Sequence, residues 1–170
     1  LEYLSGEQEK GLRKLVKAQD KFDAQNSPDA QLCYFISRIL KSESVIGARQ
    51  KYLGKAIENN IVFEGRPEAV LDYSEILLQL RSPDNAISLV QRYEQVMGEN
   101  ERSNELLIEA YIQANLFDKA EKQIEAYGPE SLKALNYKLE IAGQRASQLL
   151  QLRARQQLYN EPNAQNKISR

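Results

Sequence analysis

A helical hairpin over residues 101–127 is the feature that most constrains how this chain can fold. Apolar side chains recur there at three- and four-residue spacings on both sides of Asn115, which places them along one face of each of two short helices. These side chains are Leu106, Leu107, Ala110, Tyr111 and Ala114 before the break, and Phe117, Ala120, Ile124 and Tyr127 after it. Since two isolated helices of this length are marginal in water, further helical pairs must stack on them.

Leu107, Tyr111, Asn115 and Ala120 form the pattern L-x-x-x-Y-x-x-x-N-x-x-x-x-A, which resembles a tetratricopeptide repeat. In that family the large apolar residue and the tyrosine pack helix A against helix B. Asn or Gly ends helix A, and Ala lets helix B approach closely. A step back by the repeat length of about 34 residues leads from Ala120 to Ala86, inside a second hairpin with matching apolar positions. The resemblance implies an all-α, right-handed α-solenoid of stacked antiparallel hairpins, with about eight or nine helices.

We therefore expect a single helical repeat domain over residues 1–160, followed by a disordered tail or linker at 161–170. Its hairpins are predicted at about 29–60, 67–98, 101–127 and 129–159, the last with a turn at Gly143 and Gln144. A partial repeat or a capping helix over 1–23 precedes them. Because the chain opens in what resembles the middle of a repeat, we expect it to be a fragment of a larger protein.

The hairpin at 29–60 is predicted to bury one apolar face from each of its helices. The first face comprises Leu32, Phe35, Ile36, Ile39 and Leu40, and the second comprises Val45, Ala48, Tyr52, Leu53 and Ile57. A longer connection, 58–66, follows and contains the apolar run Ile61, Val62 and Phe63. Two interpretations stay open for this run: a plug over the hairpin junction, or a loop that contacts a partner.

Composition argues against several classes of function. The chain has no histidine and a single cysteine, Cys33, so it lacks the residues for a serine–histidine triad, a histidine–zinc site or a disulfide framework. We expect no enzymatic activity, no cofactor and no metal. A net charge of −1 gives no field that attracts nucleic acid, and no apolar run is long enough to insert into a membrane.

The candidate site follows from the resemblance, because the first helix of each stacked pair lines a concave groove that binds peptides or protein elements. The groove residues expected to bind a partner are Glu75, Leu78, Gln79, Glu105, Glu109, Ile112 and Gln113. Carboxylates and amides between apolar side chains favour a ligand with basic or amide donors. Family members that clamp a terminal carboxylate use Lys, Asn and Arg on this surface. The corresponding places here hold Cys33, Ser37, Glu75 and Glu109, so such a ligand is disfavoured.

The leading hypothesis is a non-catalytic scaffold that binds a partner protein or peptide in this groove. Self-association into a homodimer is one alternative. Another is a regulatory domain of an adjoining enzyme, such as a peptidase, or of a secretion or assembly factor. Nucleic-acid binding by related helical repeats would need a basic groove, and Glu75 and Glu109 argue against it.

Overall fold

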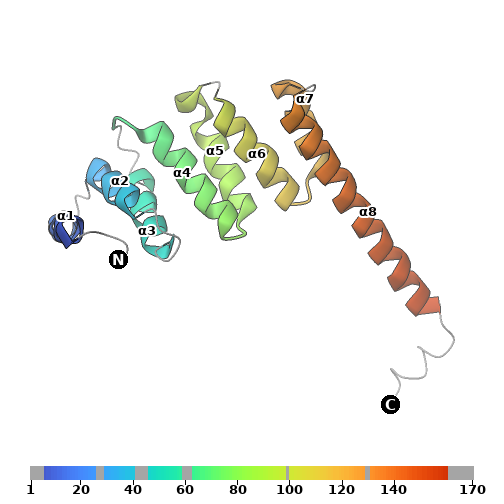
Figure 1. Cartoon of the computed structure of the whole chain (residues 1–170), viewed down its shortest axis with the longest axis horizontal. Coiled ribbons are helices and arrows are strands. Elements are labelled where there is room, and N and C mark those ends of the chain that lie inside the picture. Colours follow the sequence, from blue (N-terminus) through green and yellow to red (C-terminus); the bar gives the residue numbers. More distant parts are fainter. Residues whose placement is uncertain are drawn as a thin grey trace, which may run out of the picture. The chain divides into compact units, whose positions relative to one another are not determined.

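A computed structural model describes residues 6–25, 29–40, 46–58, 63–98, 100–128 and 131–160. This part of the chain contains eight helices and no strand, so the all-α expectation is confirmed (Figure 1). The helices are α1 (Gly6–Ala24), α2 (Ala30–Ile39), α3 (Ile46–Glu58), α4 (Arg66–Gln79), α5 (Pro83–Met97), α6 (Glu101–Gln113), α7 (Phe117–Tyr127) and α8 (Leu132–Asn160). The chain divides into two compact units, Leu1–Asn115 and Leu116–Arg170.

The first unit is built from helices that pack on their neighbours in chain order, from α1 on α2 through to α5 on α6. In addition, α4 packs directly against α6. Both α2 with α3 and α4 with α5 form closely packed pairs, in agreement with the hairpins expected at 29–60 and 67–98. At the start of the unit, one core cluster is made of buried side chains from α1, α2 and α3, with Leu40 just after α2: Leu12, Cys33, Ile36, Leu40, Tyr52 and Ala56.

Backbone conformation repeats at the predicted period. Helix α4 is followed by Arg81 with φ 57°, and α6 is followed by Asn115 with φ 59°, one repeat length further along the chain. The left-handed conformation is uncommon for residues other than glycine, and it ends both helices at equivalent points. The small residues Ala86 and Ala120, 1% and 0% exposed, also share this spacing. The predicted helix-ending role of Asn115 is therefore confirmed.

Phe35 departs from the expected apolar face of its hairpin. It is 54% exposed, whereas Ile36 beside it is fully buried, because α2 turns Ile36 and Cys33 toward α1 and α3 and leaves Phe35 outside. Ala48, predicted to lie on the buried face of the second helix of this hairpin, is likewise exposed on α3.

Phe63 resolves part of the question about the 58–66 connection. Its ring lies 5.8 Å from that of Tyr34, and its side chain packs against the core cluster of α1, α2 and α3. For Phe63 the interpretation as an apolar plug is confirmed. Ile61 and Val62 lie outside the described residues, as do Val45 and the predicted tail at 161–170.

The second unit contains α7 and α8, which pack on each other. The turn expected at Gly143 and Gln144 is wrong, since α8 runs without interruption from Leu132 to Asn160. A single glycine inside a helix costs only about 1 kcal/mol, and the residues around Gly143 are good helix formers. Gly143 also lacks the positive φ that ends helices at other glycines of the described chain. The two helices of the hairpin at 101–127 fall in different units, and their pairing stays a prediction.

Candidate partner-binding site

A depression of about 280 Å³ lies between the C-terminal ends of α4 and α6. It is lined by Glu75, Leu78, Gln79, Arg81, Glu109 and Gln113. Five of the seven residues predicted for the groove therefore surround one hollow, although they come from two helices far apart in sequence. The direct packing of α4 on α6 brings them together.

Arg81 belongs to this depression but is absent from the sequence prediction. It is exposed, and it lies just after α4, at the position equivalent to Asn115. The repeat period marks it as the residue that ends a helix, but the period carries no information on its charge. Arg81 adds a cation to a rim that was expected to be acidic and neutral.

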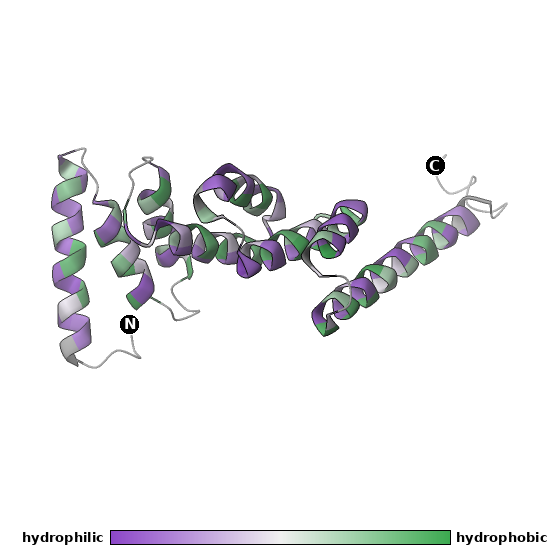
Figure 2. Ribbon diagram, turned by 90° about the horizontal axis from the view of Figure 1, so that it is seen from above, coloured by the Kyte–Doolittle hydropathy of each residue, from purple (hydrophilic) through white to green (hydrophobic). Residues whose placement is uncertain are grey.

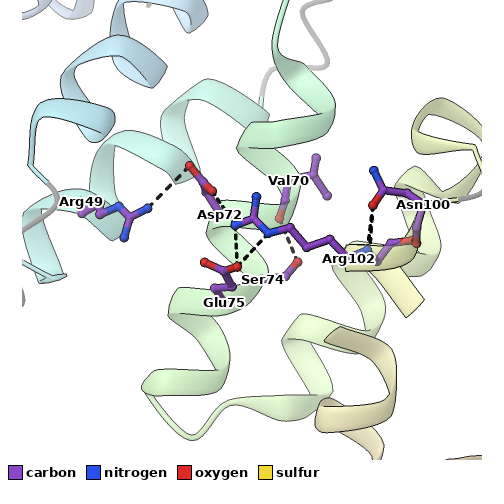
Figure 3. A network of polar contacts seen from close by, with 8 residues as sticks. Arg49, Val70, Asp72, Ser74, Glu75, Asn100 and Arg102 are labelled. Carbon is purple, nitrogen blue, oxygen red and sulfur yellow. Dashed lines mark hydrogen bonds and ion pairs between the residues drawn. The ribbon is translucent and has the colours of Figure 1, made fainter. Parts of the chain in front are cut away.

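Glu75 takes part in an ion-pair network that joins α4 to α6 (Figure 3). The guanidinium of Arg102 donates to Glu75 through Nε at 2.8 Å and through Nη2 at 2.5 Å. The same Nη2 donates to Asp72 Oδ1 at 2.7 Å, and Arg49 from α3 approaches Asp72 Oδ2 at 3.6 Å. The Glu75 carboxylate is therefore engaged in holding helices together.

Electrostatics within the network favour the charged form of Arg102. Partial burial by itself lowers the pKa of Arg102, but hydrogen bonds to Asp72 and Glu75 outweigh this effect and raise the pKa above its ordinary value. The backbone of Arg102 is held as well, because the Asn100 side chain accepts from Arg102 N at 2.9 Å and caps α6 (Figure 3). The start of α6 and its bridge to α4 are thus built from adjoining residues.

Leu78 and Ile112, predicted as apolar contacts for a ligand, are buried in the core. Only 4% of Leu78 and 2% of Ile112 is exposed, although Leu78 also lines the depression. The burial of Ile112 does not fit its assignment to a ligand-contacting surface. Both residues lie on helices that are covered on more than one side, which a one-sided helical pattern does not anticipate.

Gln79, Glu109 and Gln113 supply hydrogen-bonding groups around the depression. Gln79 and Glu109 are exposed, whereas the predicted Glu105 is half-buried and lies outside the lining. Gln113 Oε1 is buried without a hydrogen-bond donor in the described part of the chain. A buried acceptor without a donor is destabilising by about 1–3 kcal/mol. A hydrogen-bond donor from a ligand, or a flip of the Gln113 amide, would remove this cost.

A second depression, of about 450 Å³, lies beside the exposed ring of Phe35. Tyr34 and Arg38 from α2 line it together with Glu64 and Glu68 from the region where α4 begins. Sequence analysis missed this surface because it assigned Phe35 to the core. The position of Phe35 next to Ile36 gave only a weak signal, since adjacent residues of a helix point about 100° apart and both are buried only where neighbouring helices cover a wide face.

The described residues hold no cluster of three or more His, Cys, Asp or Glu side chains that could bind a metal ion. Cys33 is fully buried, and this burial raises the pKa of its thiol to about 11, so it is a poor nucleophile at neutral pH. Among the helices of the described chain, none is both long and apolar enough to cross a bilayer.

Comparisons with protein-family models, with curated proteins and with solved structures found no match to this chain.

Proposed function

We propose that this chain is a tetratricopeptide-like scaffold without catalytic activity, and that it binds a segment of a partner protein between α4 and α6. The observation that carries the proposal is the depression shared by these helices. Glu75 and Glu109 are separated by one repeat length and both line it, as do Gln79 and Gln113 at the same spacing. Equivalent positions of two repeats thus face one hollow, as expected of the concave side of a helical solenoid.

The helical stacking that this proposal assumes draws support from the first unit, while its right-handed sense is part of the proposal. Successive helices pack in chain order, and α4 and α6, the first helices of two successive predicted pairs, pack on each other. Positive φ angles end both helices at the same point of the repeat. Helical pairs stacked with this period present their first helices along one side, where an extended or helical segment can lie.

The chemistry of the depression favours a ligand rich in amide groups. Glu109 and Gln79 offer acceptors, Arg81 offers donors, and the carboxamide of Gln113 offers either after a flip. A peptide backbone, or an Asn or Gln side chain, presents a donor and an acceptor close together and suits this mixture. The acidic Glu109 suits lysine and arginine side chains of a partner.

A random-peptide display on the 170-residue chain tests the proposal. Peptides selected on this chain are titrated calorimetrically against it and against a Gln79→Lys, Glu109→Lys double variant. We expect affinity to fall at least about tenfold in the variant, because two acceptors become cations. Glu75 is left unchanged, since its replacement would disturb the bridge to Arg102.

The matched control is Glu94→Lys, a change from anion to cation at an exposed position of α5 that does not line the depression. It should leave the affinity unchanged. If the selected peptides bind the double variant as tightly as the original chain, the site between α4 and α6 is wrong. The surface beside Phe35 then becomes the candidate.

A further inference from the structure

Helix α8 carries a row of large apolar side chains on its surface. Each of the following leucines is more than half exposed: Leu132, Leu135, Leu139, Leu149 and Leu150. Hydrophobic residues recur along the ribbon of this helix in Figure 2. Exposed leucines are unremarkable one at a time, but a continuous row along one helix marks an interaction surface.

Four of these leucines, together with two exposed alanines, have the spacing of a coiled-coil seam. Its members alternate by three and four positions along the helix: Leu132, Leu135, Leu139, Ala142, Ala146 and Leu149. The residues of α8 that are buried, among those described, are Ala134 and Ile141, which lie about 110–130° around the helix from the seam on the side that packs on α7. The seam therefore lies on a face that α7 does not cover.

Helix α8 is much longer than α7, so α7 can cover only part of it. This helix has 29 residues and α7 has 11, so at a rise of 1.5 Å per residue they are about 44 Å and about 17 Å long. Every residue from 146 to 157 is exposed. An isolated helical segment of this length is marginal in water, so the C-terminal half of α8 gains stability from any helix that packs along it.

We propose that the seam of α8 binds the same seam of a second copy of this chain, with the two helices antiparallel. Centred between residues 140 and 141, this arrangement pairs Leu135 with Ala146 of the second copy and Leu139 with Ala142 of the second copy. The end layers pair Leu132 with Leu149. In the inner layers each small residue thus faces a large one, as close packing of two helices requires.

A parallel pair is less well matched. It would stack Ala142 on Ala142 and Ala146 on Ala146, and these adjacent layers would leave voids at the centre of the seam. It would also stack leucine on leucine in the other layers. Leucines of one seam meet alanines of the same seam in another copy only when the two helices run in opposite directions. The occupant that fits the seam is therefore an antiparallel second copy.

Charges beside the seam are compatible with this pairing. Lys138 and Arg145 flank it, and the antiparallel arrangement brings Lys138 close to Arg145 of the second copy. Arg145, however, forms ion pairs with Asp118 and with Glu121, each at 2.7 Å. These two carboxylates offset the repulsion between the Arg145 guanidinium and a lysine. The charges that flank the seam therefore do not oppose the apolar match.

Interface size predicts a weak, concentration-dependent dimer. At the helical rise the seam is about 27 Å long, and a helix is about 10 Å wide, which gives a footprint of roughly 300 Å² per copy. Standard stable interfaces bury about 800 Å² per partner. We therefore expect association in the micromolar to millimolar range.

Sedimentation velocity of the 170-residue chain from about 10 μM to about 1 mM tests the proposal. The mass should rise from the monomer value of 19.5 kDa toward twice that value. Leu139→Glu should weaken the dimer at least about tenfold, since a carboxylate would enter the central layer. It should leave the circular dichroism spectrum unchanged, because Leu139 is exposed. Leu80→Glu, the same change at an exposed leucine after α4, is the matched control and should dimerise normally.

Cross-linking tests the direction of the helices. Asn136→Cys and Gly143→Cys lie beside the seam, and only the antiparallel pair brings residue 136 of one copy near residue 143 of the other. A mixture of the two variants should form a disulfide-linked dimer, while each variant alone should form little. The native Cys33 is fully buried and should not interfere.

Three results would overturn the proposal. The first is a mass that stays at 19.5 kDa up to about 1 mM. The second is a dimer that persists in Leu139→Glu, which would place the contact on another surface. The third is a mixture that cross-links no better than the single variants. The dimer is independent of the site between α4 and α6, so the Gln79→Lys, Glu109→Lys variant should still dimerise.

Discussion

Helices α4 and α8 bury very different shares of their apolar residues. In α4, 14 residues long, the buried set includes Ala69, Val70, Leu71, Ile76, Leu77 and Leu78. In the 29 residues of α8, only Ala134 and Ile141 are buried among those described. The first helix packs against α3, α5 and α6, whereas the second packs against α7. A leucine stabilises the fold only where neighbouring helices remove it from water. Two helices of similar apolar content therefore contribute differently to the stability of the fold.

The largest expected effect contrasts the two helices directly. Ile76→Ala, at a fully buried site of α4, should destabilise the chain by about 3 kcal/mol, because it removes buried methyl groups and leaves a cavity. Leu139→Ala, on the exposed seam of α8, should change stability by less than about 0.5 kcal/mol in dilute monomer. Urea unfolding followed by circular dichroism measures both. Equal losses would mean that the leucines of α8 are covered in the monomer.

The ion-pair bridge of the first unit should come next in size. Arg102→Ala removes the guanidinium between Asp72 and Glu75, and we expect a loss of about 1–2 kcal/mol, at the low end for charged hydrogen bonds because Arg102 is 38% exposed. Arg92→Ala, at an exposed site of α5, is the matched control and should have little effect. A double-mutant cycle with Glu75→Gln isolates the pair, and purely additive losses would show that the bridge does not stabilise α4 on α6.

Glycine substitutions compare an interior position of α8 with a helix end in the first unit. Gly143→Ala should stabilise the chain by about 0.5–1 kcal/mol, since the added methyl group would meet no atom of another helix within 4 Å and the backbone is helical. Gly98→Ala should instead destabilise it by about 1 kcal/mol or more, because φ is +63° there. Thermal unfolding reports both. A loss of thermal stability in Gly143→Ala would instead favour the turn that the sequence predicted at this glycine.

The smallest expected effect depends on pH and concerns the ion pair of Asp23 with Lys55, which joins α1 to α3. The hydrogen bond from Lys55 lowers the pKa of Asp23, so the pair contributes stability above the ordinary value of 3.8 and loses it as pH falls through the folded value. The hydrogen bond to Asp23 raises the pKa of Lys55, so at the alkaline end the contribution persists up to 10.5 and is lost above it.

Asp23→Asn should therefore cost about 0.5 kcal/mol at neutral pH, and this cost should shrink as pH falls through the folded pKa of Asp23. Asp20→Asn, an exposed neighbour on the same helix, should show no such dependence. Urea midpoints measured across this pH range separate the two variants. An Asp23→Asn deficit that stays constant down to pH 2 would mean that its cause is packing and not charge.

Much of the first unit could be predicted from short-range pattern. The hairpins at 29–60 and 67–98, the end of α6 at Asn115 and the buried alanines one repeat length apart all follow from helical spacing and turn residues. Such signals are local, because capping and amphipathic spacing depend on residues within one or two turns. The continuity of α8 through Gly143 could not be read in this way, since a glycine is compatible with both a turn and a helix.

The candidate site was predicted in part. Positions equivalent by the repeat, such as Glu75 and Glu109, do line one depression. Pattern alone could not show that Arg102 would take up the carboxylate of Glu75, because the two residues lie on different helices and meet only once α6 packs on α4. For the same reason, the burial of Ile112 and the exposure of Phe35 escaped prediction.

The sequence by itself determined that this chain is helical, where most of its helices begin and end, and that two stretches share a common period. Those properties arise from propensity, capping and periodicity, which operate within a few turns of a helix. Only the tertiary structure decided which apolar faces are covered, which carboxylates are engaged by other helices, and that α8 offers an uncovered seam. These depend on which helices become neighbours, and the same amphipathic pattern is compatible with a core, a groove or an exposed surface.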